Sequence, residues 1–173
     1  MSAVRIVHLT DLHFGPRGAS AAGELARVVL SLQPGHVIVT GDITLAGRRS
    51  EFAAADAFLG RLPGQVVVVP GNHDVPVYAP VSRAFRPWGR FRRVTGALVN
   101  GVREDGHVRL IAVNTARRAG LHWDWSRGRV SRRQLQWLER STRPGDGGLQ
   151  AVALHPPVFR SESRAGSHLV GRR

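Results

Sequence analysis

Short apolar runs alternate with amphipathic stretches in the first half of the chain. Strand-like runs occupy residues 4–9, 37–40 and 65–69, and the last of these contains four consecutive valines. Residues 24–32 and 50–62, which lie between the runs, carry apolar side chains at helical spacing. The valine run is β-branched and apolar on both faces, which is typical of a strand covered on two sides. The alternation predicts parallel strands joined by right-handed helical crossovers.

The second half of the chain has a less regular pattern. Residues 108–113 and 149–154 predict two more strands. Residues 75–106 mix aromatic residues with arginine and proline, and they predict short helix and loop beside the ends of the strands. At 173 residues the chain has room for one domain with one sizeable core, and no repeat or linker interrupts it.

Two serines are predicted to begin helices. Ser50 is placed to cap the helix that follows it. Ser131 and Gln134 have the spacing of a capping box, which predicts another helix from this point. In that helix we expect Leu135 and Leu138 to face inward.

Polar side chains follow most of the predicted strands directly. They are Asp11, His13, Asp42, Asn72, His73, Asp74 and His155. Parallel strands bring their carboxyl ends to one edge of the sheet, where ligands bind in open α/β folds. Asp11 and His13 are two residues apart, so in an extended segment they would point the same way. Each motif alone also fits an ordinary turn or surface, and their convergence at one edge is what indicates a site.

The chemistry of these side chains suits divalent metals. Imidazole, carboxylate and amide donors favour borderline ions such as Mn²⁺, Fe²⁺ or Zn²⁺. An aspartate shared between two ions holds them roughly 3.5–4 Å apart, and such a pair lowers the pKa of a bridging hydroxide and binds phosphoryl oxygens. A free imidazole beside the pair can protonate a leaving oxygen.

Four blocks of the sequence resemble signature blocks of the calcineurin-like metallophosphoesterases. These are Asp11-Leu12-His13, Gly41-Asp42, Gly71-Asn72-His73-Asp74 and His155, in the order and approximate spacing of that family. The surroundings Asp-Leu-His-Phe-Gly, Val-Val-Pro-Gly-Asn-His-Asp-Val-Pro and Gln-Leu-x-Trp-Leu are similar to the bacterial branch that includes class III cyclic-nucleotide phosphodiesterases. The resemblance covers essentially the whole chain.

The resemblance implies a fold, a reaction and a role for each site residue. The expected fold is a four-layer αββα sandwich with mixed sheets, the second sheet incomplete. Asp11, His13 and Asp42 would bind the first metal ion. Asp42 would bridge to a second ion, held also by Asn72 and His155. The family reaction is hydrolysis of a phosphoester, with a phosphodiester favoured here and a cyclic nucleotide as one candidate substrate.

Two further residues would act on the leaving group. His73 would be the proton donor to the leaving alkoxide, and Asp74 would orient its imidazole. Both roles are implied by the resemblance.

The sequence departs from the family pattern near its end. Pro156 follows His155, where many relatives have a second histidine. The fifth block, Gly-His-x-His, which supplies one histidine to each metal, is absent, and Gly166-Ser167-His168 does not restore it. We therefore expect residues 1–173 to be a single calcineurin-like domain without that segment. An inactive remnant with weak metal binding is accordingly an alternative to an active enzyme.

The charge and composition of the chain narrow the classes of molecule that it is expected to bind. The net charge is +13, and all basic residues other than histidine are arginines, a bias that looks compositional. A basic surface attracts nucleic acid and equally any phosphorylated anion. The chain has no dense basic tail and no known nucleic-acid module, so a DNA nuclease of the same fold is the weaker alternative to an enzyme acting on small phosphoesters.

Other functional classes are excluded by what the sequence lacks. There is no cysteine, which excludes disulfides and thiolate metal sites. No apolar run is long enough to span a membrane. The first residues lead directly into strand-like sequence without a signal-peptide core, so we expect a cytoplasmic protein.

Overall fold

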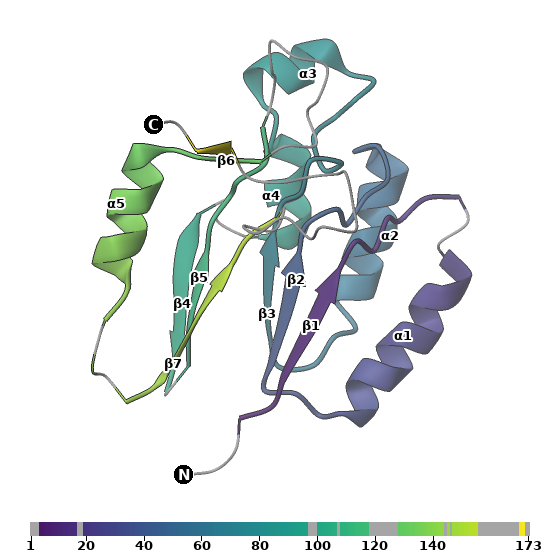
Figure 1. Cartoon of the computed structure of the whole chain (residues 1–173). Coiled ribbons are helices and arrows are strands. Elements are labelled where there is room, and N and C mark those ends of the chain that lie inside the picture. The colour runs from purple at the N-terminus through teal and green to yellow at the C-terminus, as the bar shows by residue number, and fades with distance from the viewer. Residues whose placement is uncertain are drawn as a thin grey trace, which may run out of the picture.

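The fold is described from a computed structural model (Figure 1). The residues it describes are 4–16, 19–96, 100–106, 108–117, 128–143, 145, 147–155 and 170–171. Within these residues, no helix is both long enough and apolar enough to cross a bilayer.

The first sheet consists of three parallel strands in the order β1-β2-β3. The strands are β1 (Ile6–Thr10), β2 (His36–Thr40) and β3 (Gln65–Val69). They are connected by α1 (Ala19–Ser31) and α2 (Arg49–Leu59). Thr10, Thr40 and Val69 are paired in register, so the three carboxyl ends lie side by side. The predicted parallel strands with helical crossovers are confirmed.

The second sheet has the order β4-β5-β7 and is mixed. Its strands are β4 (Gly101–Asp105), β5 (Val108–Ala112) and β7 (Leu149–Ala153). Strand β5 pairs antiparallel with β4 and parallel with β7. Strand β4 was not predicted, because its sequence ends in Arg103, Glu104 and Asp105 and shows no apolar alternation. It forms because its backbone pairs with the apolar strand β5.

Shorter elements complete the described structure. They are α3 (Pro80–Phe85), α4 (Gly89–Thr95), β6 (Arg129–Val130), α5 (Arg132–Ser141) and β8 (Val170–Gly171), with β6 and β8 paired in parallel. The predicted capping box of α5 is confirmed, since the Gln134 N–H donates to Ser131 Oγ at 3.2 Å and the Ser131 N–H donates to Gln134 Oε1 at 2.9 Å.

Two apolar clusters hold the layers together. One cluster lies between the first sheet and helices α1, α2 and α4, and it includes Val37 and Val39 of β2. The other lies between the two sheets, and it includes Ile38 of the same strand. Alternate residues of β2 therefore serve both clusters, as expected for a strand covered on both faces. Helix α5 lies outside the second sheet, so the layers run helix, sheet, sheet, helix (Figure 1), and the predicted αββα sandwich is confirmed.

Two local predictions were wrong. Helix α2 is capped at Arg48 and not at Ser50, because the carboxylate of Glu51 supplies the acceptor for the N–H groups of the preceding turn. Leu135 is 53% exposed and does not face inward. Helix α5 instead turns Gln134 and Ser141 towards the sheet, where Gln134 Nε2 donates to Asn114 O at 2.6 Å.

Candidate metal centre

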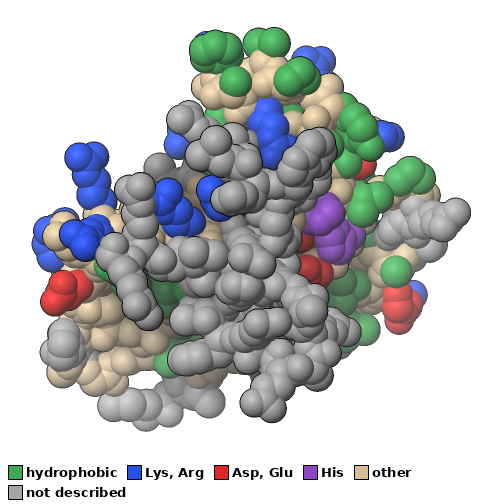
Figure 2. Space-filling model, turned by 45° about the horizontal axis from the view of Figure 1, so that its top comes forward, with side chains coloured by type: hydrophobic (Ala, Val, Ile, Leu, Met, Phe, Trp, Pro, Cys, Tyr) green, Lys and Arg blue, Asp and Glu red, His purple; other side chains and the backbone are tan. Residues whose placement is uncertain are grey.

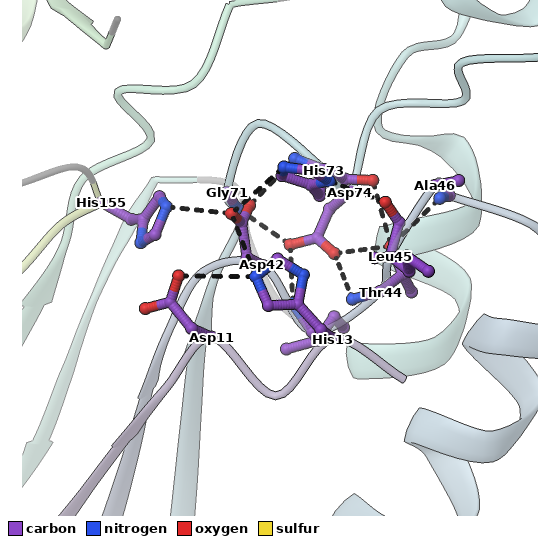
Figure 3. Close-up of polar contacts among 12 residues, drawn as sticks. Asp11, His13, Asp42, Thr44, Leu45, Ala46, Gly71, His73, Asp74 and His155 are labelled. Carbon is purple, nitrogen blue, oxygen red and sulfur yellow. Dashed lines mark hydrogen bonds and ion pairs between the residues drawn. The ribbon is translucent and has the colours of Figure 1, made fainter. Parts of the chain in front are cut away.

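The polar residues predicted from the strand ends gather at one edge of the sandwich (Figure 3). Asp11 and His13 follow β1, Asp42 follows β2, His73 and Asp74 follow β3, and His155 follows β7. Asn72 lies between Gly71 and His73 and is 9% exposed. Among the described residues, the structure gives its side-chain amide no hydrogen bond.

Asp42 lies at the centre of the group. Its carboxylate is almost completely buried, and Oδ2 lies 3.4 Å from His155 Nε2. The same oxygen lies 4.0 Å from His13 Nε2 and 4.0 Å from His73 Nε2. Burial raises the pKa of Asp42, but the contact with His155 and the His73 N–H outweigh it, so the pKa is lowered overall. Asp42 is therefore a carboxylate surrounded by imidazoles.

Asp11, His13 and Asp42 have the geometry of a metal-binding group. One donor atom from each lies within 4.8 Å of the others, and His13 Nε2 is 3.7 Å from Asp11 Oδ1. Donors bound about 2.0–2.2 Å from one ion are separated from one another by roughly 3–4.4 Å. Two carboxylates and an imidazole also match the preferences of Mn²⁺, Fe²⁺ and Zn²⁺. These residues fit the divalent ion that the sequence predicts.

The backbone at these ligands is left-handed. The φ angles are 54° at Asp11, 44° at His13 and 50° at Asp42. Non-glycine residues avoid this region at a cost of order 1–3 kcal/mol, and where they occur they cluster at functional sites. Hydrogen bonds from Asp11 N to Gly41 O at 3.3 Å and from His13 N to Asp42 O at 2.9 Å hold the two loops together. The expectation that Asp11 and His13 share a side through extended alternation is therefore wrong, because a left-handed turn brings them together.

Two glycines allow the loops to approach closely. A Cβ at Gly41, where φ is +72°, would lie 2.4 Å from Cγ of His155. A Cβ at Gly71 would lie 2.1 Å from Asp42 Oδ1. Gly71 does not have a positive φ. Its role is to leave room for the Asp42 carboxylate.

His155 is held in a single tautomer. Its Nδ1 lies 3.0 Å from the carbonyl oxygen of Thr40. A carbonyl only accepts, so Nδ1 carries a proton and Nε2 is the nitrogen that points towards Asp42 Oδ2. Burial lowers the pKa of His155, but its contacts with Asp42 raise it overall. An imidazole with one nitrogen fixed on a backbone carbonyl and the other free is the usual arrangement of a histidine that binds metal.

His73 is fixed in the same way on a different carbonyl. Its Nδ1 lies 2.6 Å from Leu45 O, and its backbone N–H donates to Asp42 Oδ1 at 2.9 Å. The ring is edge-on to that of His13, with centroids 4.9 Å apart. Its side chain is 37% exposed, so Nε2 is within reach of a bound substrate.

Asp74 does not orient the His73 imidazole, contrary to the expectation. Its fully buried carboxylate accepts from Thr44 N at 2.9 Å, Thr44 Oγ1 at 2.9 Å, Gly71 N at 2.9 Å and Ile43 N at 3.3 Å. These bonds tie the loop after β2 to the loop after β3. Burial raises the pKa of Asp74 to about 6, although the N–H groups of Gly71 and Thr44 act in the opposite direction.

The sequence did not reveal the two backbone carbonyls of the site, Thr40 O and Leu45 O. A carbonyl that selects a tautomer has no side-chain signature, so no pattern could have found it. Glu51, which holds the loop next to Leu45, carries a weak signal because it lies three residues after the helix cap.

Comparison with known proteins agrees with this geometry. The chain is similar to the glycerophosphodiester phosphodiesterase GpdQ of Enterobacter lignolyticus (strain SCF1), with 34% identity over an alignment of 80 positions that covers 40% of this chain. The match spans 29% of the length of that relative. The sequence profile of the calcineurin-like phosphoesterases matches residues 4–173. The chain therefore belongs to the calcineurin-like phosphoesterase family.

Proposed function

We propose that this protein hydrolyses small phosphodiesters with two divalent metal ions. The observation that carries the proposal is the position of Asp42, whose Oδ2 faces imidazole nitrogens on several sides at 3.4–4.0 Å. A carboxylate in this position can be shared between two ions.

The chain offers ligands on both sides of that carboxylate. Asp11 and His13 would hold the first ion together with Asp42, and Asn72 and His155 would hold the second. Bound ions of this kind lower the pKa of water and bind phosphoryl oxygens. Thr40 O keeps His155 Nε2 free for that purpose. Mn, Fe or Zn suit this donor set.

His73 is the proposed proton donor to the leaving oxygen. It is more exposed than the buried His155, and its Nδ1 is already bonded to Leu45 O. A protonated ring therefore has one free N–H, at Nε2, and that proton can pass to the leaving oxygen. The buried Asp74 would act only indirectly, by fixing the two loops that carry Asp42 and His73.

The proposed substrates are small diesters. The curated relative is named as a glycerophosphodiester phosphodiesterase, which makes such diesters candidates beside cyclic nucleotides. Figure 2 shows surface histidine next to acidic side chains, with arginine side chains on the same face. Arginine on this face attracts anionic substrates. Nucleic acid stays the weaker candidate, and a cytoplasmic location stays a prediction.

The test combines metal binding with hydrolysis. Calorimetry with Mn²⁺ should show binding that is lost in Asp42→Asn and kept in Asp56→Asn, a control at an exposed position of α2. In a chain extended by a Gly-His-x-His segment and with excess Mn²⁺, hydrolysis of bis(p-nitrophenyl) phosphate should exceed that of p-nitrophenyl phosphate. A preference for the monoester would contradict the diester assignment. Absence of both activities, in this chain and in one extended by a Gly-His-x-His segment, would favour the inactive remnant.

A further inference from the structure

The loop between β2 and α2 carries the carbonyl group that orients His73. Leu45 O accepts from His73 Nδ1 at 2.6 Å. This carbonyl belongs to the same peptide unit as the N–H of Ala46. In a planar trans peptide the C=O and N–H point in opposite directions. Whatever binds the Ala46 N–H therefore also sets the direction of the Leu45 carbonyl.

Glu51 binds this peptide unit from its other side. Glu51 Oε2 accepts from Ala46 N at 2.8 Å and from Arg48 N at 3.0 Å. The side chain lies in the first turn of α2 and is 4% exposed, so water does not compete for these bonds. Hydrogen bonds to a charged acceptor are stronger than neutral ones. A carboxylate, a peptide unit and an imidazole thus form one continuous chain of hydrogen bonds that ends at His73.

Neighbouring peptide units of the same loop are also held. Arg90 Nη1 donates to Gly47 O at 2.6 Å, and the Gly47 N–H donates to Thr44 Oγ1 at 3.2 Å. The N–H of Val77 donates to Ala46 O at 3.3 Å. The loop is fixed on both sides of residue 46, and Glu51 is the contact that acts directly on the peptide unit facing His73.

We propose that Glu51 is a positioning residue, which fixes His73 through the Leu45–Ala46 peptide in the tautomer and ring orientation that present Nε2 to the substrate. The catalytic consequence rests on the proposed function, in which His73 protonates the leaving oxygen. The tautomer itself does not depend on that function, so the two can be tested separately.

The tautomer is measured without metal or substrate. Two-bond ¹H–¹⁵N NMR spectra show which imidazole nitrogen carries the proton, and His73→Gln assigns the signal. At a pH where the ring is neutral, the wild type should be protonated at Nδ1. Glu51→Ala should shift the population towards Nε2–H. Glu51→Gln should resemble the wild type, because one amide oxygen can accept both bonds that Oε2 makes. An unchanged tautomer in Glu51→Ala would overturn the proposal.

Loss of stability is separated from loss of orientation by a matched control. Glu51→Ala leaves two N–H groups without their acceptor, so its Tm should fall. Val29→Ala, at a position of α1 that is 1% exposed, should also lower the Tm and leave the His73 tautomer unchanged. If Glu51→Ala does not fold, Arg90→Ala takes its place and should shift the tautomer in the same direction by less. A shift in Val29→Ala equal to that in Glu51→Ala or Arg90→Ala would reduce the role of Glu51 to stability.

The effect of Glu51 on catalysis is measured with two diesters that differ in their leaving groups. In a chain extended by a Gly-His-x-His segment and with excess Mn²⁺, Glu51→Ala should lose about 10-fold in kcat on a diester with an alkoxide leaving group, a part of the 10²–10⁴-fold that general acid catalysis contributes. On bis(p-nitrophenyl) phosphate, whose leaving group needs no proton, the loss should be below about 3-fold. Equal losses on both would argue against positioning of a proton donor. If the chain extended by a Gly-His-x-His segment hydrolyses neither diester, the proposed function fails while the NMR result still decides the role of Glu51.

Discussion

The two sheets of this protein contribute unequally to the candidate site. All the site residues except His155 follow strands of the first sheet, and all five residues of its middle strand β2 are buried. Strand β7, which precedes His155, is less covered than β2, since only Ala153 is buried and Leu149 and Val152 are 49% and 42% exposed. Asp42, the residue at the centre of the site, thus follows a strand that is packed on both faces, where alternative positions of the backbone are excluded.

His155 shows how a less covered strand can still be followed by a fixed side chain. Its Nδ1 bonds to Thr40 O at 3.0 Å, and its ring lies against Gly41, both at the end of β2. The hydroxyl of Thr115 donates to its carbonyl oxygen. His155 is therefore positioned largely by the first sheet, although it follows a strand of the second.

The largest expected effect comes from replacing Asp42, whose carboxylate lies just after the end of β2. Asp42→Ala should remove more metal than His13→Ala, Asn72→Ala or His155→Ala, because Asp42 is assigned to both ions. Its kcat should fall by about 10⁴-fold or more, since each ion contributes several kcal/mol to the transition state. Elemental analysis and kinetics of the four purified variants test this. Equal metal content in all four would contradict the assignment of Asp42 to both ions.

The next effect concerns His73, which is proposed as a proton donor and not as a metal ligand. In a chain extended by a Gly-His-x-His segment, His73→Ala should keep its metal but lose about 10²–10⁴-fold in kcat on a diester with a poor leaving group. The loss should be smaller with a nitrophenolate leaving group, which departs without a proton. A series of diesters of graded leaving-group pKa measures the difference. A uniform loss along the series would mean that His73 has another role.

The next prediction concerns extension of the chain by the Gly-His-x-His segment, which the second sheet is expected to lack. We predict that the 173-residue chain binds Mn²⁺ weakly and hydrolyses bis(p-nitrophenyl) phosphate poorly or not at all. Extension by a Gly-His-x-His segment should strengthen metal binding at least about 10-fold, because even the residues that only support a metal ligand are worth 10–100-fold in affinity. Both chains are compared at matched concentration with excess Mn²⁺. Equal turnover by the two would show that the residues already present complete the site.

A smaller effect tests the close approach of the loops in the first sheet. Gly71→Ala should destabilise the fold by about 1–3 kcal/mol and weaken metal binding. The added Cβ would lie 2.1 Å from Asp42 Oδ1. Gly23→Ala is the control, since nothing lies within 4 Å of its Cβ in α1. That variant should be more stable by about 0.5–1 kcal/mol, through helix propensity. Calorimetric titration with Mn²⁺ and urea unfolding give both quantities, and unchanged metal affinity in Gly71→Ala would contradict the account.

The smallest expected effect comes from a comparison of side-chain packing in β2 and in β7. Val39→Ala in β2, where the side chain is 0% exposed, should lower the free energy of unfolding by about 2 kcal/mol. Val152→Ala in β7, at 42% exposure, should lower it by less than about 0.5 kcal/mol. Urea denaturation of both variants provides the numbers. Similar losses at the two positions would mean that β7 is as well packed as β2.

Much of the fold and of the site's composition followed from local sequence. The strand and helix periods of the first half predicted β1, β2 and β3 and their parallel order, because apolar side chains at those periods can be buried in only one way. Strand β4 was not predicted, since its charged residues form a strand only against the apolar β5. Ser50 and Leu135 were misplaced because a buried carboxylate and the orientation of a packed helix overrode local preference.

The sequence by itself determined which donor groups the site contains, because each follows a strand whose end the apolar pattern marks. The tertiary structure decided how those groups are held. The left-handed turns at Asp11 and Asp42, the tautomer of His155 on Thr40 O and that of His73 on Leu45 O all depend on loops brought together from separate strands. Asp74 likewise changed from an expected partner of His73 to a buried acceptor for two loops. Backbone groups carry no signature in sequence, so contacts made through them appear only when the chain is folded.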